Sequence, residues 1–160
     1  MRIAKKDSGV RSVNYAEALE ESLCYGWIDG QKRAFDKETW LQRFTPRTKR
    51  SIWSKINCEK VAALIKSGRM KAPGLAEVER AKADGRWEQA YDSHRTSTVP
   101  PDLQTALDRN PRAKAFFSTV SAGNRYAVLW RVQTAKKAET RARRIQQYVE
   151  MLGKHQKFHP

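Results

Sequence analysis

Residues that begin and end helices recur along most of this chain, and their spacing permits only short helices. Asn14 followed by Glu17 has the pattern of a capping box, and Asn110 followed by Pro111 joins an N-cap to a first-position proline. Glycines close several apolar stretches: Gly26, Gly68, Gly85 and Gly153. The chain is therefore expected to form short helices that gain their stability by packing on one another or on a sheet.

Apolar residues at three- and four-residue spacing indicate which segments are helical. The predicted helices cover residues 14–24, 58–67 (with Asn57 as N-cap), 73–85, 101–107, 111–120, 121–130 and 137–152. A short strand is predicted at Met1–Lys6, and the aromatic and β-branched segments Tyr25–Arg33 and Thr39–Thr45 predict a β-hairpin. The predicted fold class is α+β: a mostly helical single domain, a small antiparallel hairpin or sheet near the N-terminus, and a C-terminal helical subdomain.

The segment 92–101, DSHRTSTVPP, is the clearest connector in the chain. It separates an N-terminal α+β part, residues 1–91, from a C-terminal helical part, residues 102–153. The second part is small for a core of its own, so we expect it to pack on the first. Residues 154–160 are expected to form a frayed tail.

The charge of the chain is strongly positive and unevenly placed. Its 160 residues include 32 Lys and Arg against 17 Asp and Glu, a formal net charge of +15. Two segments, 30–72 and 125–157, hold the excess, and residues 73–124 are close to neutral. This distribution excludes an acidic disordered tail and favours anionic partners: nucleic acid, phosphorylated ligands or an anionic membrane surface.

Each basic segment contains candidate anion-binding residues. In the first they are Arg43, Thr45, Arg47, Lys49, Arg50 and Trp53; in the second they are Arg125, Lys136, Lys137, Arg141 and Arg144. Arginine holds phosphate oxygens bidentately, hydroxyls add hydrogen bonds, and a tryptophan can stack on a base. The alternatives are a solvated basic loop with Trp53 as a core anchor, and a solvated helix face. If the fold joins the two sets, they form two sides of one surface.

Evidence for catalysis in the sequence is thin. Motifs of the serine hydrolases, zinc proteases, P-loop proteins and dinucleotide-binding proteins are absent, and no cofactor is expected. Asp29, between Ile28 and Gly30, is a weak candidate for an acid or base, although such a carboxylate more commonly pairs with an arginine and fixes a turn. Cys24 and Cys58 are expected to be reduced thiols, and the histidines have no metal-ligand spacing. Whether the chain is an enzyme stays open, and the balance is against it.

Several separated motifs occur in an order that resembles a known family. They are NYAEAL (14–19), LCYGWIDG (23–30), RFTPR (43–47), Trp53-Ser54, GRM (68–70), DGRW (84–87), Val99-Pro100 and AKKAETRARRI (135–145). Over residues 5–153 the chain resembles the YdeI/OmpD-associated family, also called bacteriocin-protection proteins of the OmdA type. Members usually carry an N-terminal helix and a fuller first strand before the segment that matches Arg2–Lys6.

The resemblance implies a part in resistance to cationic antimicrobial peptides, in association with an outer-membrane porin. The family is sometimes described as periplasmic, whereas this chain shows no signal peptide and no membrane-spanning segment, so a cytoplasmic location is expected. Because a charge of +15 repels cationic peptides, an indirect route to resistance is favoured. A non-enzymatic protein with an anion-binding surface is therefore the leading hypothesis. The alternatives are a small enzyme that uses Asp29 on a phosphorylated or carboxylated molecule, and a protein-interaction module. The sequence does not indicate an oligomeric state.

Overall fold

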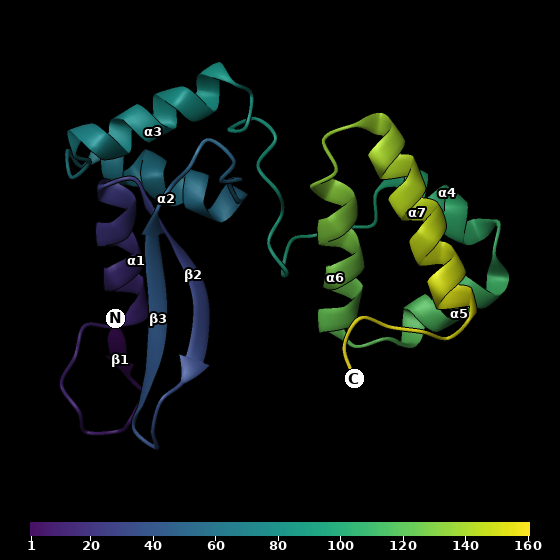
Figure 1. Cartoon of the computed structure of the whole chain (residues 1–160), viewed down its shortest axis with the longest axis horizontal. Coiled ribbons are helices and arrows are strands. Elements are labelled where there is room, and N and C mark those ends of the chain that lie inside the picture. Colours follow the sequence, from purple (N-terminus) through teal and green to yellow (C-terminus); the bar gives the residue numbers. More distant parts are fainter. The chain divides into compact units, whose positions relative to one another are not determined.

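A computed structural model describes residues 1–160 and confirms an α+β fold with seven helices and three strands (Figure 1). The chain divides into two compact units, Met1–Ala90 and Tyr91–Pro160. The first contains β1 (Arg2–Ala4), α1 (Tyr15–Cys24), β2 (Trp27–Ala34), β3 (Thr39–Pro46), α2 (Lys55–Lys66) and α3 (Ala72–Ala83). The second contains α4 (Pro101–Asp108), α5 (Pro111–Thr119), α6 (Ala122–Gln133) and α7 (Ala138–Gly153).

The sheet of the N-terminal unit is antiparallel, with strand order β1-β3-β2. β2 and β3 form the predicted hairpin, and their pairing is irregular between Asp29 and Lys32, where β2 bulges. β1 pairs with the first half of β3 only, with Arg2 opposite Leu41 and Ala4 opposite Thr39. β3 is therefore central, and β1 and β2 are edge strands.

Alternate residues of a strand point to opposite faces of the sheet. One face of this sheet packs on α1. Trp40 of β3 lies on this face, with its ring centroid 6.0 Å from that of Tyr15 in α1. α2 and α3 pack on α1 in turn (Figure 1). The core of the unit is formed by Leu19, Leu23, Cys24, Trp53, Val61, Leu64, Val78, Ala81 and Ala90. The opposite face of the sheet carries Leu41 and exposed arginines.

Two glycines allow α1 and α3 to approach closely. Gly26 follows α1 with φ +76°, a conformation that favours glycine. A Cβ atom on Gly74, in the first turn of α3, would lie 2.2 Å from the carbonyl oxygen of Cys24. The backbones therefore meet with no room for a side chain, and Lys71 donates its N–H to the same carbonyl.

The start of α2 differs from the sequence prediction. The N-cap is Ser54, whose hydroxyl accepts the backbone N–H of Asn57 at 3.2 Å, so Asn57 lies in the first turn and is buried. Two cap-forming residues three positions apart compete for one helix start, and packing of Asn57 into the unit decides between them. The predicted caps Asn14, Asn110 and Ser121 are observed.

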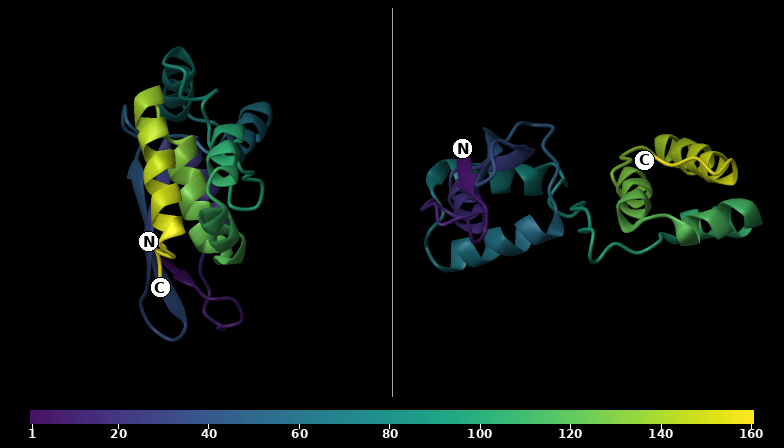
Figure 2. Two further views of the ribbon diagram at one scale, coloured as in Figure 1. Left: turned by 90° about the vertical axis from the view of Figure 1, so that its right-hand side faces the viewer. Right: turned by 90° about the horizontal axis from the view of Figure 1, so that it is seen from below.

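The four helices of the C-terminal unit enclose a second core (Figure 2). Its buried residues include Leu103, Leu107, Phe117, Val128, Leu129, Val132, Ile145, Tyr148 and Leu152. We expected a frayed tail at residues 154–160, and the structure differs. Phe158 packs on Tyr148 with ring centroids 5.2 Å apart, and the N–H of His159 donates to Oδ1 of Asn124 at 2.9 Å. An aromatic residue near the end of the chain thus covers part of the core.

Candidate anion-binding site

A basic pocket lies beside β2 and β3 and extends to Met1. It has a volume of about 630 Å³ and is lined by Met1, Gln31, Lys32, Arg33, Leu41, Gln42 and Arg43. Lys32, Arg33 and Arg43 are exposed, and no carboxylate lines the pocket. Three cations around one hollow, without an acid among them, create a positive local potential suited to an anion.

The bulge in β2 determines how this pocket is lined. Beyond it, Lys32 lies opposite Gln42 and Arg33 lies opposite Leu41. The side chain of Gln42 is buried and donates from Nε2 to the carbonyls of Gly30 and Arg43, both at 3.0 Å. Gln42 thus satisfies carbonyl groups at the irregular pairing and fixes the register of the cations on β2.

Two residues of the first predicted set belong to the core. The guanidinium carbon of Arg47 lies 3.4 Å from the centroid of the Trp53 ring, and its Nη1 donates to the carbonyl of Ile52. Trp53 is 2% exposed and packs on Trp87 with ring centroids 4.9 Å apart. Trp53 is therefore the core anchor of the alternative interpretation, because a buried ring cannot stack on a base.

Sequence reasoning missed a second buried arginine, Arg86. Its Nη1 donates to the carbonyl of Ser51 at 2.7 Å, and its Nε forms an ion pair with Asp84 at 2.8 Å. Arg47 and Arg86 thus hold neighbouring carbonyls of the loop that precedes α2. Arg86 belongs to the DGRW motif, residues 84–87. The nearby Asp84 does not by itself indicate that the guanidinium group of Arg86 is buried.

The other residues of the first set remain accessible to different degrees. Lys49 and Arg50 are exposed in a turn that Thr48 and Ser51 close, with the N–H of Ser51 donating to the carbonyl of Thr48 at 3.0 Å. Thr45 is half-buried on β3. Of the predicted residues, only Arg43 lines the basic pocket, where Lys32 and Arg33 of β2 accompany it.

The second set lies in the C-terminal unit, and its arginines have structural partners. Arg141 forms an ion pair with Asp102, with Nε 2.6 Å from Oδ2, and also donates to the carbonyl of Val132. The hydrogen bond from Arg141 lowers the pKa of the Asp102 carboxyl. Arg125 donates to the carbonyl of Phe117, and Arg144 donates to a carbonyl of α6. Lys136 and Lys137 are exposed at the start of α7.

Asp29, the weak catalytic candidate, accepts a hydrogen bond from the Tyr15 hydroxyl at 2.7 Å. The bond ties β2 to the first turn of α1. The partner is therefore a tyrosine, where an arginine was expected. Asp29 does not line the basic pocket.

Both cysteines of the chain lie in the N-terminal unit. Cys24 and Cys58 are both free, and burial raises the pKa of the Cys58 thiol to about 11, so it is protonated at neutral pH. No group of three or more His, Cys, Asp and Glu side chains is arranged to hold a metal ion. None of the helices combines the length and apolar character needed to cross a bilayer.

Comparison with known families separates the two halves of the chain. Residues 96–155 match the family described as Bacteriocin-protection, YdeI or OmpD-Associated, or OmdA. This region of the chain is therefore similar to OmdA proteins. The match covers α4 to α7 and confirms the resemblance over that region. Residues 1–77 match a different family, described as a domain of unknown function, DUF8412. The basic pocket therefore lies outside the OmdA region. No curated protein and no solved structure matches the chain.

Proposed function

We propose that this chain is a non-enzymatic binding protein that holds a phosphate-bearing anion in the basic pocket of its sheet. The observation that carries the proposal is that Lys32, Arg33 and Arg43 all line one hollow without a carboxylate. Two guanidinium groups offer bidentate hydrogen bonds to phosphate oxygens, and the ammonium group adds a point charge. Lys49 and Arg50 add positive charge on the same unit.

A role in resistance to antimicrobial peptides would then be indirect, and we place the protein in the cytoplasm. A chain of net charge +15 attracts polyanions and disfavours encounters with free cationic peptides. The exposed cations Lys136 and Lys137 belong to the OmdA region and form a second, weaker candidate for the same chemistry.

The test is a titration of a fluorescein-labelled DNA duplex and, separately, of inorganic polyphosphate at several salt concentrations. Three phosphate contacts predict a log–log salt slope of about −2.7 for the duplex, because each contact contributes about −0.9. The double variant Arg33→Ala/Arg43→Ala is expected to weaken binding at least tenfold. A control with the same change in charge, Arg112→Ala/Lys154→Ala, alters exposed residues of the other unit and should stay within twofold.

The two probes distinguish the possible ligands. Binding of polyphosphate without the duplex would identify a small phosphorylated ligand, and binding of both would identify a general phosphate site. Equal losses in the two double variants would show that net charge alone drives binding and would overturn the proposed site. An absence of binding to either probe at micromolar protein and low salt would overturn the proposed function.

A further inference from the structure

Cross-strand pairing places three arginines on one face of the sheet. Arg2 of β1 and Arg33 of β2 both lie opposite Leu41 of β3, and residues that pair directly point to the same face. Arg43 lies two residues beyond Leu41 and therefore points the same way. We call this surface the outer face. Phe44, on the opposite face, packs on the core that α1 helps to form.

An exposed aromatic residue, Phe35, lies beside these arginines. It follows β2 directly, two residues beyond Arg33, and so continues the row of side chains on the outer face. The guanidinium carbon of Arg2 lies 5.3 Å from the centroid of the Phe35 ring, which confirms that the two share this face. Phe35 is 54% exposed, so it is accessible to a ligand.

The strands contribute no carboxylate to the outer face. Asp29 is the one acidic residue in β1, β2 and β3; it lies opposite Phe44 and accepts a hydrogen bond from Tyr15 of α1, so it belongs to the other face. Oδ1 of Asp36, in the turn after β2, accepts two backbone N–H groups of that turn at 2.9 and 2.6 Å. The outer face is therefore basic and carries an exposed ring.

The spacing of these groups suits an extended ligand with both phosphates and a planar ring. Neighbouring strands lie about 4.8 Å apart, so the backbones of Arg2 and Arg33 are separated by about 10 Å across β3. Arg43 and Phe35 lie about 13 Å apart along the strands, at about 3.3 Å per residue. A single phosphate group makes no use of the ring, whereas an oligonucleotide can place phosphates on the arginines and a base on Phe35.

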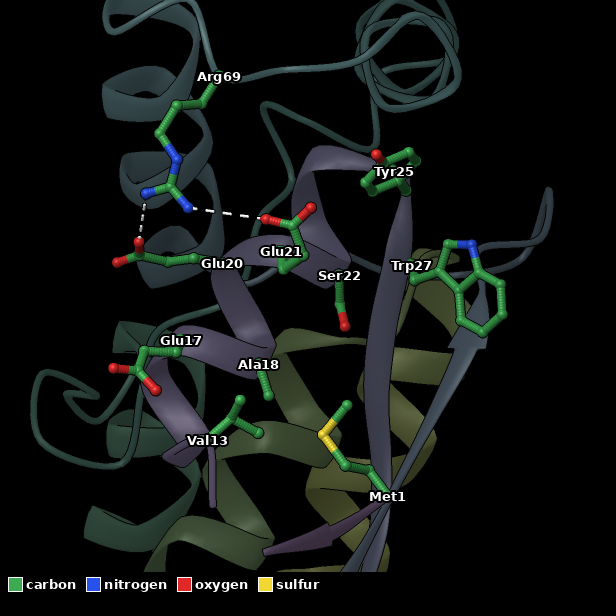
Figure 3. A pocket seen from close by; sticks show the side chains of 10 residues that line it. All are labelled: Met1, Val13, Glu17, Ala18, Glu20, Glu21, Ser22, Tyr25, Trp27 and Arg69. Carbon is green, nitrogen blue, oxygen red and sulfur yellow. Dashed lines mark hydrogen bonds and ion pairs between the residues drawn. The ribbon is translucent and has the colours of Figure 1, made fainter. Parts of the chain in front are cut away.

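A second hollow of the same unit, beside α1, has a different character (Figure 3). Glu17, Glu20 and Glu21 line it, and Arg69 is the one side-chain cation in its lining. Arg69 lies 2.8 Å from a carboxylate oxygen of Glu20 and 3.8 Å from one of Glu21, as the dashed lines in Figure 3 show. An acidic lining disfavours a polyanion, so this hollow is not an alternative site for the same ligand.

We propose that the phosphate-bearing ligand is a single-stranded nucleic acid, which lies over the outer face with one base stacked on Phe35 and phosphates on Arg33 and Arg43. This inference rests on the proposed function and names its ligand class. A base within a duplex is already stacked on its neighbours, so a single strand is favoured over a duplex. Every base has a ring face and every nucleotide a phosphate, so little sequence preference is expected.

The first test compares two labelled strands by fluorescence polarisation: an oligonucleotide of eight thymidines and an abasic strand of the same length. The protein should bind the thymidine strand at least fivefold more tightly, because stacking on an aromatic ring adds affinity that phosphates alone do not supply. Phe35→Ala should remove this preference, and Phe35→Trp should retain it. The control Ile65→Ala, at an exposed apolar position of α2, should change neither affinity by more than twofold. Equal binding of the two strands, or a preference that survives Phe35→Ala, would overturn the inference.

The salt dependence of binding separates the ring from the arginines. Each phosphate contact contributes about −0.7 to the log–log slope of a single strand, so Arg33→Ala/Arg43→Ala should make the slope less negative by about 1.4. Phe35→Ala should weaken binding of the thymidine strand and leave the slope unchanged, because a stacked ring releases no counterions. A slope that changes in Phe35→Ala, or that stays the same in the double variant, would contradict these roles.

Further probes distinguish a failure of this inference from a failure of the proposed function. If the abasic strand and inorganic polyphosphate bind through Arg33 and Arg43, and bases add no affinity, the inference is wrong and the anion site stands. If neither the strands nor polyphosphate bind at micromolar protein and low salt, the proposed function is wrong as well. Tighter binding of a duplex than of a single strand with the same number of phosphates would overturn the choice of a single strand.

Discussion

Arg47 and Arg43 lie four residues apart in sequence, yet they have different surroundings. Arg43 is exposed and lines the basic pocket, whereas Arg47 is buried over the Trp53 ring. A guanidinium group is suited to both places, because it is weakly hydrated, planar and able to stack on an aromatic ring. The two arginines should therefore respond differently to the same substitution.

We expect Arg47→Met to lower the free energy of unfolding by about 2 kcal/mol, the value of a desolvated cation–π contact, and to leave duplex binding unchanged. Arg43→Met should weaken binding and change stability by less than about 0.5 kcal/mol, as is usual for exposed positions. Urea denaturation followed by tryptophan fluorescence gives the stabilities. Similar stabilities of the two variants would contradict the assignment of Arg47 to the core.

At the scale of elements, the contact between α1 and α3 depends on a glycine. A Cβ atom on Gly74 would overlap the backbone of Cys24, whereas a Cβ atom on Gly123 in α6 would meet nothing within 4 Å. Backbone atoms cannot move aside as a flexible side chain can, so a substitution at Gly74 must separate the two helices.

Gly74→Ala is therefore expected to destabilise the N-terminal unit by about 3 kcal/mol. The matched variant Gly123→Ala should be neutral or more stable by about 0.5 kcal/mol, because alanine has the higher helix propensity. Thermal unfolding measured by circular dichroism compares them. A wild-type melting temperature for Gly74→Ala would show that the close approach of α1 and α3 is not required.

The second element contact is the ion pair between Asp102 of α4 and Arg141 of α7. Because the pKa of Asp102 is lowered in the folded protein, the pair stabilises the fold above the ordinary carboxyl pKa. This stabilisation decreases as the pH falls through the folded-state pKa. Arg141 also reaches the carbonyl of Val132, so one guanidinium group connects α4, α6 and α7.

Asp102→Asn is expected to lower the melting temperature at pH 7 more than at pH 3. At the lower pH a growing fraction of the wild-type carboxyl is protonated, particularly in the unfolded chain, so less stabilisation remains to be lost. Glu150→Gln, on the exposed side of α7, is the control and should show a small difference at both pH values. An equal effect of Asp102→Asn at both pH values would contradict the account of this pair.

At the scale of the whole molecule, local signals predicted most of the elements. Caps such as Asn14 and Asn110 act within one helical turn, so they can be read without knowledge of tertiary structure. The start of α2 required more, because the choice between Ser54 and Asn57 depends on burial. The ordered tail depends on Phe158 finding a core that distant helices build.

The candidate site was less predictable than the fold. Lys32 and Arg33 belong to the basic segment 30–72. Whether a residue of this segment lines the pocket depends on strand register and on the bulge that follows Asp29. The burial of Trp53 likewise depends on its packing against Trp87, more than thirty residues away. The charge density indicates the basic segment, and the register of β2 and β3 determines which of its residues line the pocket.

The family matches follow the division into units. The DUF8412 match at residues 1–77 lies within Met1–Ala90, and the OmdA match at residues 96–155 lies within Tyr91–Pro160. The proposed anion site belongs to the first unit, outside the region that matches the OmdA family.

A map of backbone amide chemical shifts during a titration with inorganic polyphosphate tests the anion site most directly. The proposal predicts that the largest changes lie at Lys32, Arg33, Leu41 and Arg43, that they saturate together, and that they disappear as salt is raised. Changes confined to the start of α7 at residues 136–144, or scattered evenly over both units, would contradict an anion site on the sheet.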